Sequence, residues 1–259
     1  MQPLSKKSLI VFDLDGTLTE SKAPLQPDMA RALAALLERK KVAIIGGGSY
    51  EQFKNQFVRR FQCPSALFKS LFLFPTTSTS FYRYQRRGWK QVYRKVLKPA
   101  EKKKIMHAFA DAFATIKYVP PKKLWGNAIE DRGSQITFSA LGQKAPVKAK
   151  AAWNKKNDVR PALMKIMQKE LSKFEVRRGG LTSIDVTQKG IDKAYGVRQI
   201  EKVLKIRIKD MVFVGDALYP GGNDAAAKKT GVQTIAVKGP KDTIKIIKKI
   251  LKASRRAGK

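Results

Sequence analysis

The segment Asp13-Leu14-Asp15-Gly16-Thr17 places two carboxylates directly after the apolar run Leu9-Ile10-Val11-Phe12. A short apolar run that ends at a glycine turn is typical of a buried strand in a parallel sheet. Open α/β sheets bind their ligands outside the carboxyl ends of the strands. The pair therefore predicts an α/β fold with chemistry at this strand end. Taken alone, Asp15-Gly16 is also compatible with a simple tight turn, because Asp-Gly is a strong turn dipeptide.

A second acidic cluster follows another short apolar strand. Met211-Val212-Phe213-Val214 leads into Gly215-Asp216, and Asp224 follows Pro220-Gly221-Gly222-Asn223. The chain has only 20 Asp and Glu against 54 Lys and Arg, so acidic clusters at two strand ends need a reason. Carboxylates from two strand ends can converge on one Mg²⁺, which prefers oxygen ligands. The second cluster favours a metal-dependent site over the turn interpretation.

Composition excludes several other kinds of site. The single cysteine, Cys63, excludes an intramolecular disulfide and a cysteine metal cage, and the single histidine, His107, excludes a multi-histidine zinc site. No apolar stretch reaches the length of a membrane span, and no signal-peptide core precedes the first strand. We expect a soluble cytoplasmic protein with no membrane partner.

The formal net charge of +34 attracts anionic partners. Three explanations are open: nucleic-acid binding, steering of phosphorylated substrates, or a general surface bias with no specific partner. The lysines are spread over most of the expected helices, and neither an aromatic RNA-recognition motif nor a zinc finger is present. Nucleic acid is therefore expected as a partner only through non-specific charge.

Hydrophobic periodicity divides the chain into a discontinuous core and an insert. In residues 1–79 and 187–259, apolar strands alternate with amphipathic helices, which is the pattern of a parallel sheet. Residues 80–186 carry hairpins and helices in the pattern of an α+β domain. The predicted fold is an α/β, Rossmann-like parallel-sheet core with an inserted α+β cap domain, and an insert of this size is an ordinary domain that can act as a lid.

The expected elements follow from the same periodicity. Core strands are predicted at residues 9–12, 41–45, 211–214 and 233–237, with helices at 27–38, 50–61, 191–204, 224–230 and 242–252. The insert is predicted to contain hairpins at 81–84 with 89–93 and at 128–131 with 135–141, helices at 100–116 and 159–173, and strands at 174–178 and 183–186.

Five stretches in this order resemble the motifs of the haloacid dehalogenase-like (HAD) phosphohydrolases and phosphotransferases. The order and spacing are similar to subfamily IIB, whose α/β cap lies between the second and third motifs, and within it to eukaryotic-type phosphomannomutases. The likeness spans nearly the whole chain, and five ordered motifs are far more specific than one. The matching stretches are Asp13-Leu14-Asp15-Gly16-Thr17-Leu18-Thr19, Gly47-Gly48-Ser49, Ser183-Ile184-Asp185-Val186, Gly190-Ile191-Asp192-Lys193, and Gly215-Asp216 with Pro220-Gly221-Gly222-Asn223-Asp224.

The resemblance implies a role for each matching residue. Asp13 would attack phosphorus to form an aspartyl-phosphate, and Asp15 would act as general acid and base. Ser49 and Lys193 would bind the phosphate, whose transfer needs donors and positive charge. Mg²⁺ would be held by Asp13, the backbone carbonyl of Asp15, Asp216 and Asp224.

Two of these roles have alternatives. Ser49 is also a good helix N-cap, a role that can coexist with phosphate binding. Lys189 is a rival for Lys193, although the Gly190-Ile191-Asp192-Lys193 context favours Lys193.

Substrate choice in the resembled family lies with the cap, where arginines hold the distal phosphate of the sugar in a bidentate fork. Arg132 keeps its place, and Ser183 with Asp185 matches the sugar-contacting pair. Trp125 and Gln143 stand where two arginines are expected, and Lys22 stands in place of a third.

Loss of these anchors favours hydrolysis, because a mutase must hold a bisphosphate in two orientations. We therefore expect a Mg²⁺-dependent phosphohydrolase of a small phosphorylated metabolite, a sugar phosphate. The alternative is a phosphomannomutase-like phosphosugar mutase, and a less favoured one is a basic nucleic-acid-binding protein on a HAD scaffold. The expected assembly is a monomer or a cap-mediated homodimer.

Overall fold

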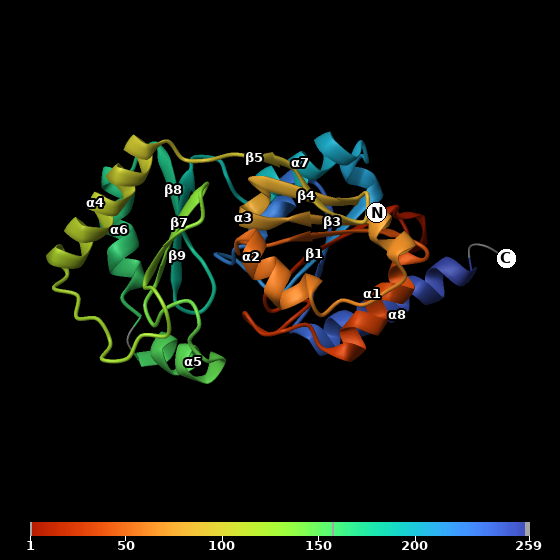
Figure 1. Cartoon of the computed structure of the whole chain (residues 1–259), viewed down its shortest axis with the longest axis horizontal. Coiled ribbons are helices and arrows are strands. Elements are labelled where there is room, and N and C mark those ends of the chain that lie inside the picture. Colours follow the sequence, from red (N-terminus) through yellow and green to blue (C-terminus); the bar gives the residue numbers. More distant parts are fainter. Residues whose placement is uncertain (1, 157, 257–259) are drawn as a thin grey trace. The chain divides into compact units, whose positions relative to one another are not determined.

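The computed structural model describes residues 2–156 and 158–256. The chain forms two compact units, which we call the core unit (residues 1–94 and 192–259) and the insert unit (residues 95–191). Both are drawn in Figure 1. None of the described helices has the length and apolar character that a membrane crossing requires.

The core unit is built on a seven-stranded sheet in the order β11-β10-β1-β2-β3-β4-β5. The first five strands in that order are parallel to their neighbours, and β4 and β5 add an antiparallel hairpin at one edge. The strands are β1 (Leu9–Asp13), β2 (Lys41–Ile45), β3 (Leu71–Phe74), β4 (Ser80–Gln85), β5 (Gly88–Arg94), β10 (Met211–Gly215) and β11 (Gln233–Ala236).

The central strands are apolar throughout because helices cover both faces of the sheet. Successive side chains of a strand point to opposite faces. Accordingly, Ile10 and Phe12 of β1 pack with α1 (Pro27–Leu37) and α8 (Pro240–Arg256). Leu9 and Val11 pack on the other face with α7 (Lys193–Leu204). Figure 1 shows α7 on one side of this sheet and α1 with α8 on the other. This confirms the predicted α/β fold with a parallel-sheet core.

The insert unit is a four-stranded antiparallel sheet in the order β6-β7-β9-β8, with three helices. Alternate residues of β7 and β9 separate an apolar face, which packs against α4 and α6, from a polar face. The elements are α4 (Pro99–Thr115), β6 (Ile129–Asp131), β7 (Gln135–Ser139), α5 (Val147–Lys156), α6 (Arg160–Glu170), β8 (Phe174–Arg178) and β9 (Ser183–Gln188).

The structure differs from the sequence expectations at several places in the core unit. No strand was expected over residues 71–74, where β3 pairs in parallel with β2. The hairpin β4–β5 extends the core sheet, whereas residues from 80 onward were expected in the insert; β4 pairs with β3 through Phe72 and Leu73. The segment expected as one helix over 50–61 consists of α2 (Tyr50–Phe53) and a π-helical segment, Lys54–Val58. The segment expected as a helix over 224–230 is a 3-10 helix, Ala225–Thr230.

In the insert unit, α5 was not expected. Its sequence is dominated by lysine and alanine, and only Lys150 and Trp153 are buried. A helix with so few buried side chains lacks the apolar periodicity that predicts one from sequence.

The turn between β3 and β4 forms backbone hydrogen bonds with the loop that follows β2. The turn α3 (Pro75–Ser78) has three consecutive residues in the left-handed region, with φ of 49°, 55° and 65° at Thr76, Thr77 and Ser78. The Thr76 N–H donates to the Gly48 carbonyl at 2.9 Å, and the Thr77 N–H donates to the Gly46 carbonyl at 2.8 Å. Left-handed conformations cost about 1–2 kcal/mol per non-glycine residue, and β-branched residues tolerate them poorly. The turn therefore carries strain while it orders the loop leading to Ser49.

This strain predicts a stabilising substitution. Thr77→Asn should raise the free energy of unfolding by about 1 kcal/mol, because asparagine tolerates positive φ and keeps the backbone N–H that bonds to Gly46. Urea denaturation measures the change. Thr77→Val, which has the same branched shape, should bring no gain, and equal stability of all three proteins would contradict the strain interpretation.

Candidate functional site

Four charged side chains meet at the carboxyl end of the parallel sheet. Asp13 is the last residue of β1, and Asp216 directly follows β10. These strands are parallel neighbours, with Phe12 in register with Val214, so their carboxyl ends lie side by side. Asp224 and Lys193, the first residue of α7, complete the group. The pairing of β1 with β10 thus brings together Asp13 and Asp216, which lie about 200 positions apart in the chain. The sequence predicts this for a site at the strand ends.

The buried Lys193 ammonium lies between two of these carboxylates. Its Nζ forms a short ion pair with Asp13 Oδ1 and lies 3.3 Å from Asp224 Oδ1. It also donates to the Ile45 carbonyl at the end of β2, at 3.4 Å. Burial by itself lowers the pKa of Lys193, but the Asp13 and Asp224 carboxylates outweigh it and raise that pKa above its ordinary value. Lys193 is therefore held as a cation.

One ammonium does not balance three carboxylates. Burial raises the pKa of Asp13 well above its ordinary value; Lys193 opposes this rise, and the other two carboxylates add to it. Burial, and then the charge of Asp224, raise the pKa of Asp216 to about 6. Both pKa values are raised because the carboxyl groups are poorly solvated and because the cluster carries more negative than positive charge.

The donor set fits a divalent cation. Carboxylate oxygens of Asp13, Asp216 and Asp224 lie within 4.8 Å of one another. Asp224 Oδ1 is buried and lies 3.3 Å from the Lys193 ammonium, while Oδ2 accepts the Ala217 N–H at 3.2 Å. Asp216 Oδ1 is oriented by the Thr17 hydroxyl at 3.3 Å. An all-oxygen set with an excess negative charge is the kind of site that binds Mg²⁺.

Gly16, beside this cluster, occupies a position that has no room for a side chain. Gly16 has a φ of +85°, and a Cβ at this position would collide with the Asp216 carboxylate. The turn after β1 therefore lets the backbone approach Asp216 closely, which a side chain would prevent.

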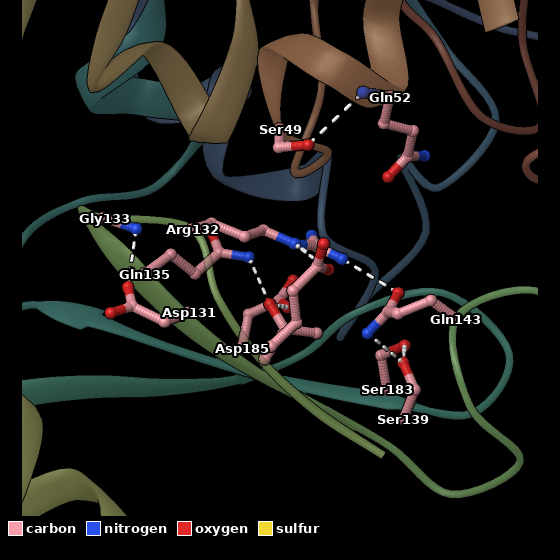
Figure 2. A network of polar contacts seen from close by, with 12 residues as sticks. Ser49, Gln52, Asp131, Arg132, Gly133, Gln135, Ser139, Gln143, Ser183 and Asp185 are labelled. Atoms are coloured by element: carbon pink, nitrogen blue, oxygen red, sulfur yellow. Dashed lines mark hydrogen bonds and ion pairs between the residues drawn. The ribbon is translucent and has the colours of Figure 1, made fainter. Parts of the chain in front are cut away.

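Ser49 begins α2 and caps it. Its Oγ accepts the Gln52 N–H at 3.3 Å, as Figure 2 shows. The capping role expected as an alternative is present, and the hydroxyl keeps its own hydrogen for a further bond.

Asp15 is bonded to groups outside the acidic cluster. Its Oδ1 accepts the Lys22 N–H at 2.6 Å and Gln56 Nε2 at 2.7 Å, and its Oδ2 accepts Gln52 Nε2 at 3.3 Å. Gln56 is buried and also donates to the Thr19 hydroxyl at 2.6 Å. The carboxylate of Asp15 is thus held in one orientation by two glutamines.

Neither glutamine was expected from the sequence. The signal is present, since Gln52 and Gln56 lie four residues apart and each directly precedes a phenylalanine, Phe53 or Phe57. Four residues is the spacing of neighbours on one helix face, and a buried amide among phenylalanines needs polar partners.

The two remaining lysine candidates lie elsewhere. Lys22, at a φ of 57°, contributes its backbone N–H to Asp15. Lys189 belongs to the insert unit, where its exposed Nζ donates to the Ser172 carbonyl at 3.5 Å. Of the two rival lysines, the one that contacts Asp13 is Lys193.

In the insert unit, Arg132, Gln143, Ser183 and Asp185 lie in a network of polar contacts (Figure 2). Arg132 pairs with Glu130 at 2.7 Å and donates to Gln143 Oε1 at 2.9 Å. Gln143 Nε2 donates to Ser139 Oγ at 2.8 Å, which in turn lies 2.8 Å from Ser183 Oγ.

Asp185 and Trp125, also in the insert unit, form separate contacts. Asp185 Oδ1 accepts the Thr137 hydroxyl at 2.8 Å. The Trp125 N–H donates to the Leu141 carbonyl at 2.9 Å, and Lys123 lies over the Trp125 ring at 5.1 Å from its centre. Arg132 therefore contacts the amide of Gln143 and the carboxylate of Glu130, which balances its charge.

Comparison with known sequences gives one consistent result. The sequence model of the family described as "Eukaryotic phosphomannomutase" matches residues 29–253. A probable phosphomannomutase of Caenorhabditis elegans is 26% identical over 262 residues, covering 96% of this chain and 98% of the relative. A phosphomannomutase of Encephalitozoon cuniculi is 28% identical, covering 95% and 94%.

Comparison with solved structures agrees on the fold. An IMP-nucleotidase of Plasmodium falciparum superposes with a TM-score of 0.73 at 19% identity, covering 95% of this chain and 68% of that one. A trehalose-6-phosphate phosphatase related protein superposes with a TM-score of 0.55 at 14% identity, covering 96% and 100%. At these identities the likeness concerns the HAD fold alone.

The excess negative charge predicts opposite effects of one substitution with and without metal. At pH 8, above the raised pKa of Asp216, the ionised carboxyl destabilises the metal-free protein, so Asp216→Asn should raise Tm. With Mg²⁺ at about 100 times its Kd, the wild type should gain about 2.7 kcal/mol and become the more stable of the two. Thermal unfolding with EDTA or Mg²⁺ measures both effects.

The exposed Asp28→Asn is the matched control for this measurement and should leave the Mg²⁺ response unchanged. An equal Mg²⁺ response of the wild type and Asp216→Asn would show that the ion does not bind at this cluster.

Proposed function

The chain belongs to the eukaryotic phosphomannomutase family of HAD-type phosphotransferases, and on this premise we propose that it is a Mg²⁺-dependent phosphosugar mutase acting through Asp13. The observation that carries the proposal is the extent of the match, since relatives named phosphomannomutase align over more than nine tenths of both chains. The juxtaposition of Asp13, Lys193, Asp216 and Asp224 supports the same chemistry.

The first half-reaction transfers the phosphoryl group to the protein. A carboxylate oxygen of Asp13 attacks phosphorus, and the bond from phosphorus to the sugar oxygen breaks as the aspartyl-phosphate forms. Asp15 gives its proton to the leaving sugar oxygen. Lys193 offsets negative charge beside Asp13, and the Ser49 hydroxyl donates to a phosphate oxygen.

The second half-reaction reverses these roles. Asp15 removes the proton of a sugar hydroxyl, whose oxygen attacks the phosphorus and releases Asp13. Bound Mg²⁺ supplies positive charge that allows a carboxylate to approach a phosphate dianion. Asp13, Asp216, Asp224 and the backbone carbonyl of Asp15 would hold it.

We assign substrate selection to the insert unit. Arg132, Ser183 and Asp185, which lie on one polar face, are the residues proposed to bind the sugar part, and Lys22 is proposed as a further substrate contact from the core unit. Amide, hydroxyl and carboxylate groups suit sugar hydroxyls, and a guanidinium suits a phosphate.

A hydrolase acting on a sugar phosphate is the second candidate, and one observation favours it. Gln143 and Trp125 stand where the resembled family has arginines, and Gln143 is bonded to Arg132 and Ser139 instead. With fewer guanidinium groups, a bisphosphate intermediate is held less firmly, and water then replaces the sugar hydroxyl as the acceptor.

Product analysis separates the two candidates. With Mg²⁺, mannose 1-phosphate and a hexose bisphosphate activator, the mutase should form mannose 6-phosphate, whereas a hydrolase releases free phosphate. Asp13→Asn should lower either rate by at least about 1,000-fold, because no aspartyl-phosphate can form. Asp28→Asn serves as the control, and normal turnover by Asp13→Asn would overturn the mechanism.

The contacts of Asp15 predict a loss of turnover without loss of binding. Gln56→Leu should lower kcat roughly 10- to 100-fold, because Asp15 loses a donor that orients it. KM should change little, since Ser49 and Lys193 remain. Steady-state kinetics measure both parameters, with the exposed Asn55→Leu as the neighbouring control. An unchanged kcat would exclude a positioning role for Gln56.

A further inference from the structure

The exposed side of α8 carries a regular row of lysines that the proposed reaction does not use. Lys241, Lys245, Lys248 and Lys252 are exposed and follow one another at intervals of four, three and four residues. This spacing places all four on one side of the helix. With the adjacent Lys249, also exposed, we call them the α8 lysine face. At 1.5 Å per residue the row is about 16 Å long.

Little negative charge opposes this face. The acidic residue of α8 is Asp242, which lies 3.6 Å from Lys245 in a largely exposed pair. Among the ion pairs between described side chains, Lys245 is the one member of the face that takes part. The N-terminal 3-10 helix that packs against α8 adds the exposed Lys6, and the neighbouring α1 exposes Asp28 and Glu38 beside Arg31 and Arg39. The neighbouring elements therefore do not neutralise the row.

The opposite side of α8 is not available to a membrane. Thr243, Ile247 and Ile250 are fully buried, and the two isoleucines pack in the core with α1. A helix that lies in a bilayer interface inserts its apolar face, but here that face belongs to the protein core. The exposed large apolar residues of the described chain are all outside α8. What α8 offers to a partner is thus positive charge alone.

We propose that the α8 lysine face binds the phosphate backbone of duplex nucleic acid without reading its sequence. Over about 16 Å of its axis, a duplex carries about nine phosphates on its two strands, so a row of four or five lysines has enough phosphates within reach on the side that faces it. Over residues 240–254, whose side chains the structure describes, the exposed side of α8 carries no aromatic, Asn, Gln or Arg side chain of the kind that reads base edges or stacks on bases. The face is therefore suited to phosphate contacts, which position a protein on a duplex but carry no sequence information.

The test compares two quadruple variants of the full chain. Lys241→Ala, Lys245→Ala, Lys248→Ala and Lys252→Ala together remove the face. Lys103→Ala, Lys104→Ala, Lys165→Ala and Lys169→Ala together remove four exposed lysines from helices α4 and α6, with the same loss of charge. The probe is a fluorescent 20-base-pair DNA duplex, and anisotropy titrations from 50 to 200 mM salt give the slope of log K against log salt concentration.

Each phosphate contact contributes about 0.9 to the magnitude of this slope. Removal of the α8 lysine face should lower the magnitude by about 3–4, and the control variant should change it by less than 1. Far-UV circular dichroism and Tm establish that both variants fold. Turnover with mannose 1-phosphate should be the same in both variants as in the wild type, so the outcome is independent of which phosphotransfer reaction the enzyme performs.

Three results would overturn the proposal. Equal slopes in the two variants would mean that the net charge acts as a whole, with no defined surface. Absence of duplex binding by the wild type at 50 mM salt would exclude this partner. Tighter, α8-dependent binding to phosphatidylserine vesicles than to the duplex would make a lipid surface the partner instead.

Discussion

The buried ion pairs of Lys193 are the interaction on which the site depends. Removal of one ammonium would leave three carboxylates facing one another at the ends of β1 and β10, with no protein cation between them. Breaking a buried pair by removal of one partner is strongly destabilising, because an uncompensated charge remains. The parallel sheet brings the carboxylates together, and α7 is anchored so that its first residue reaches them. The negative charge that remains at this cluster is suited to a divalent cation.

The residues around this ion-pair cluster are held in place by hydrogen bonds from neutral groups. The left-handed turn after β3 holds the loop before Ser49 through backbone hydrogen bonds, and two glutamines hold Asp15. In a protein with a net charge of +34, the proposed phosphate-transfer site thus uses few of the lysines. The charge lies mainly on exposed helix surfaces, where α8 shows the most regular arrangement. Family membership and overall charge are therefore separate properties of this chain, and each requires its own physical explanation.

The insert unit carries the residues on which the choice between the two candidate reactions depends. Its antiparallel sheet keeps an apolar face and a polar face, and Arg132 lies on the polar one. Gln143 has no charge, and it joins Arg132 to the serines through hydrogen bonds. The resemblance leads us to expect a guanidinium at this position, and an amide offers donors and acceptors but lacks a guanidinium's affinity for a dianion. This is why the names of the relatives and the chemistry of the insert lead to two candidate reactions.

Local patterns in the sequence determined four of the five parallel core strands, with β3 missed, together with the principal helices and the acidic residues that follow two of the strands. The apolar runs of β1 and β10 predict buried parallel strands, and side chains directly after such strands must lie at one edge of the sheet. The local pattern of the sequence did not reveal that the hairpin β4–β5 joins the core sheet. The sequence of β4 marks it as a strand, but it does not specify which other strand β4 pairs with. Nor did the local pattern reveal α5, which buries few side chains, or the glutamines of Asp15. Only the tertiary structure decided which of two lysines contacts Asp13 and how three carboxylates share its charge, since such contacts depend on distances between residues far apart in the chain.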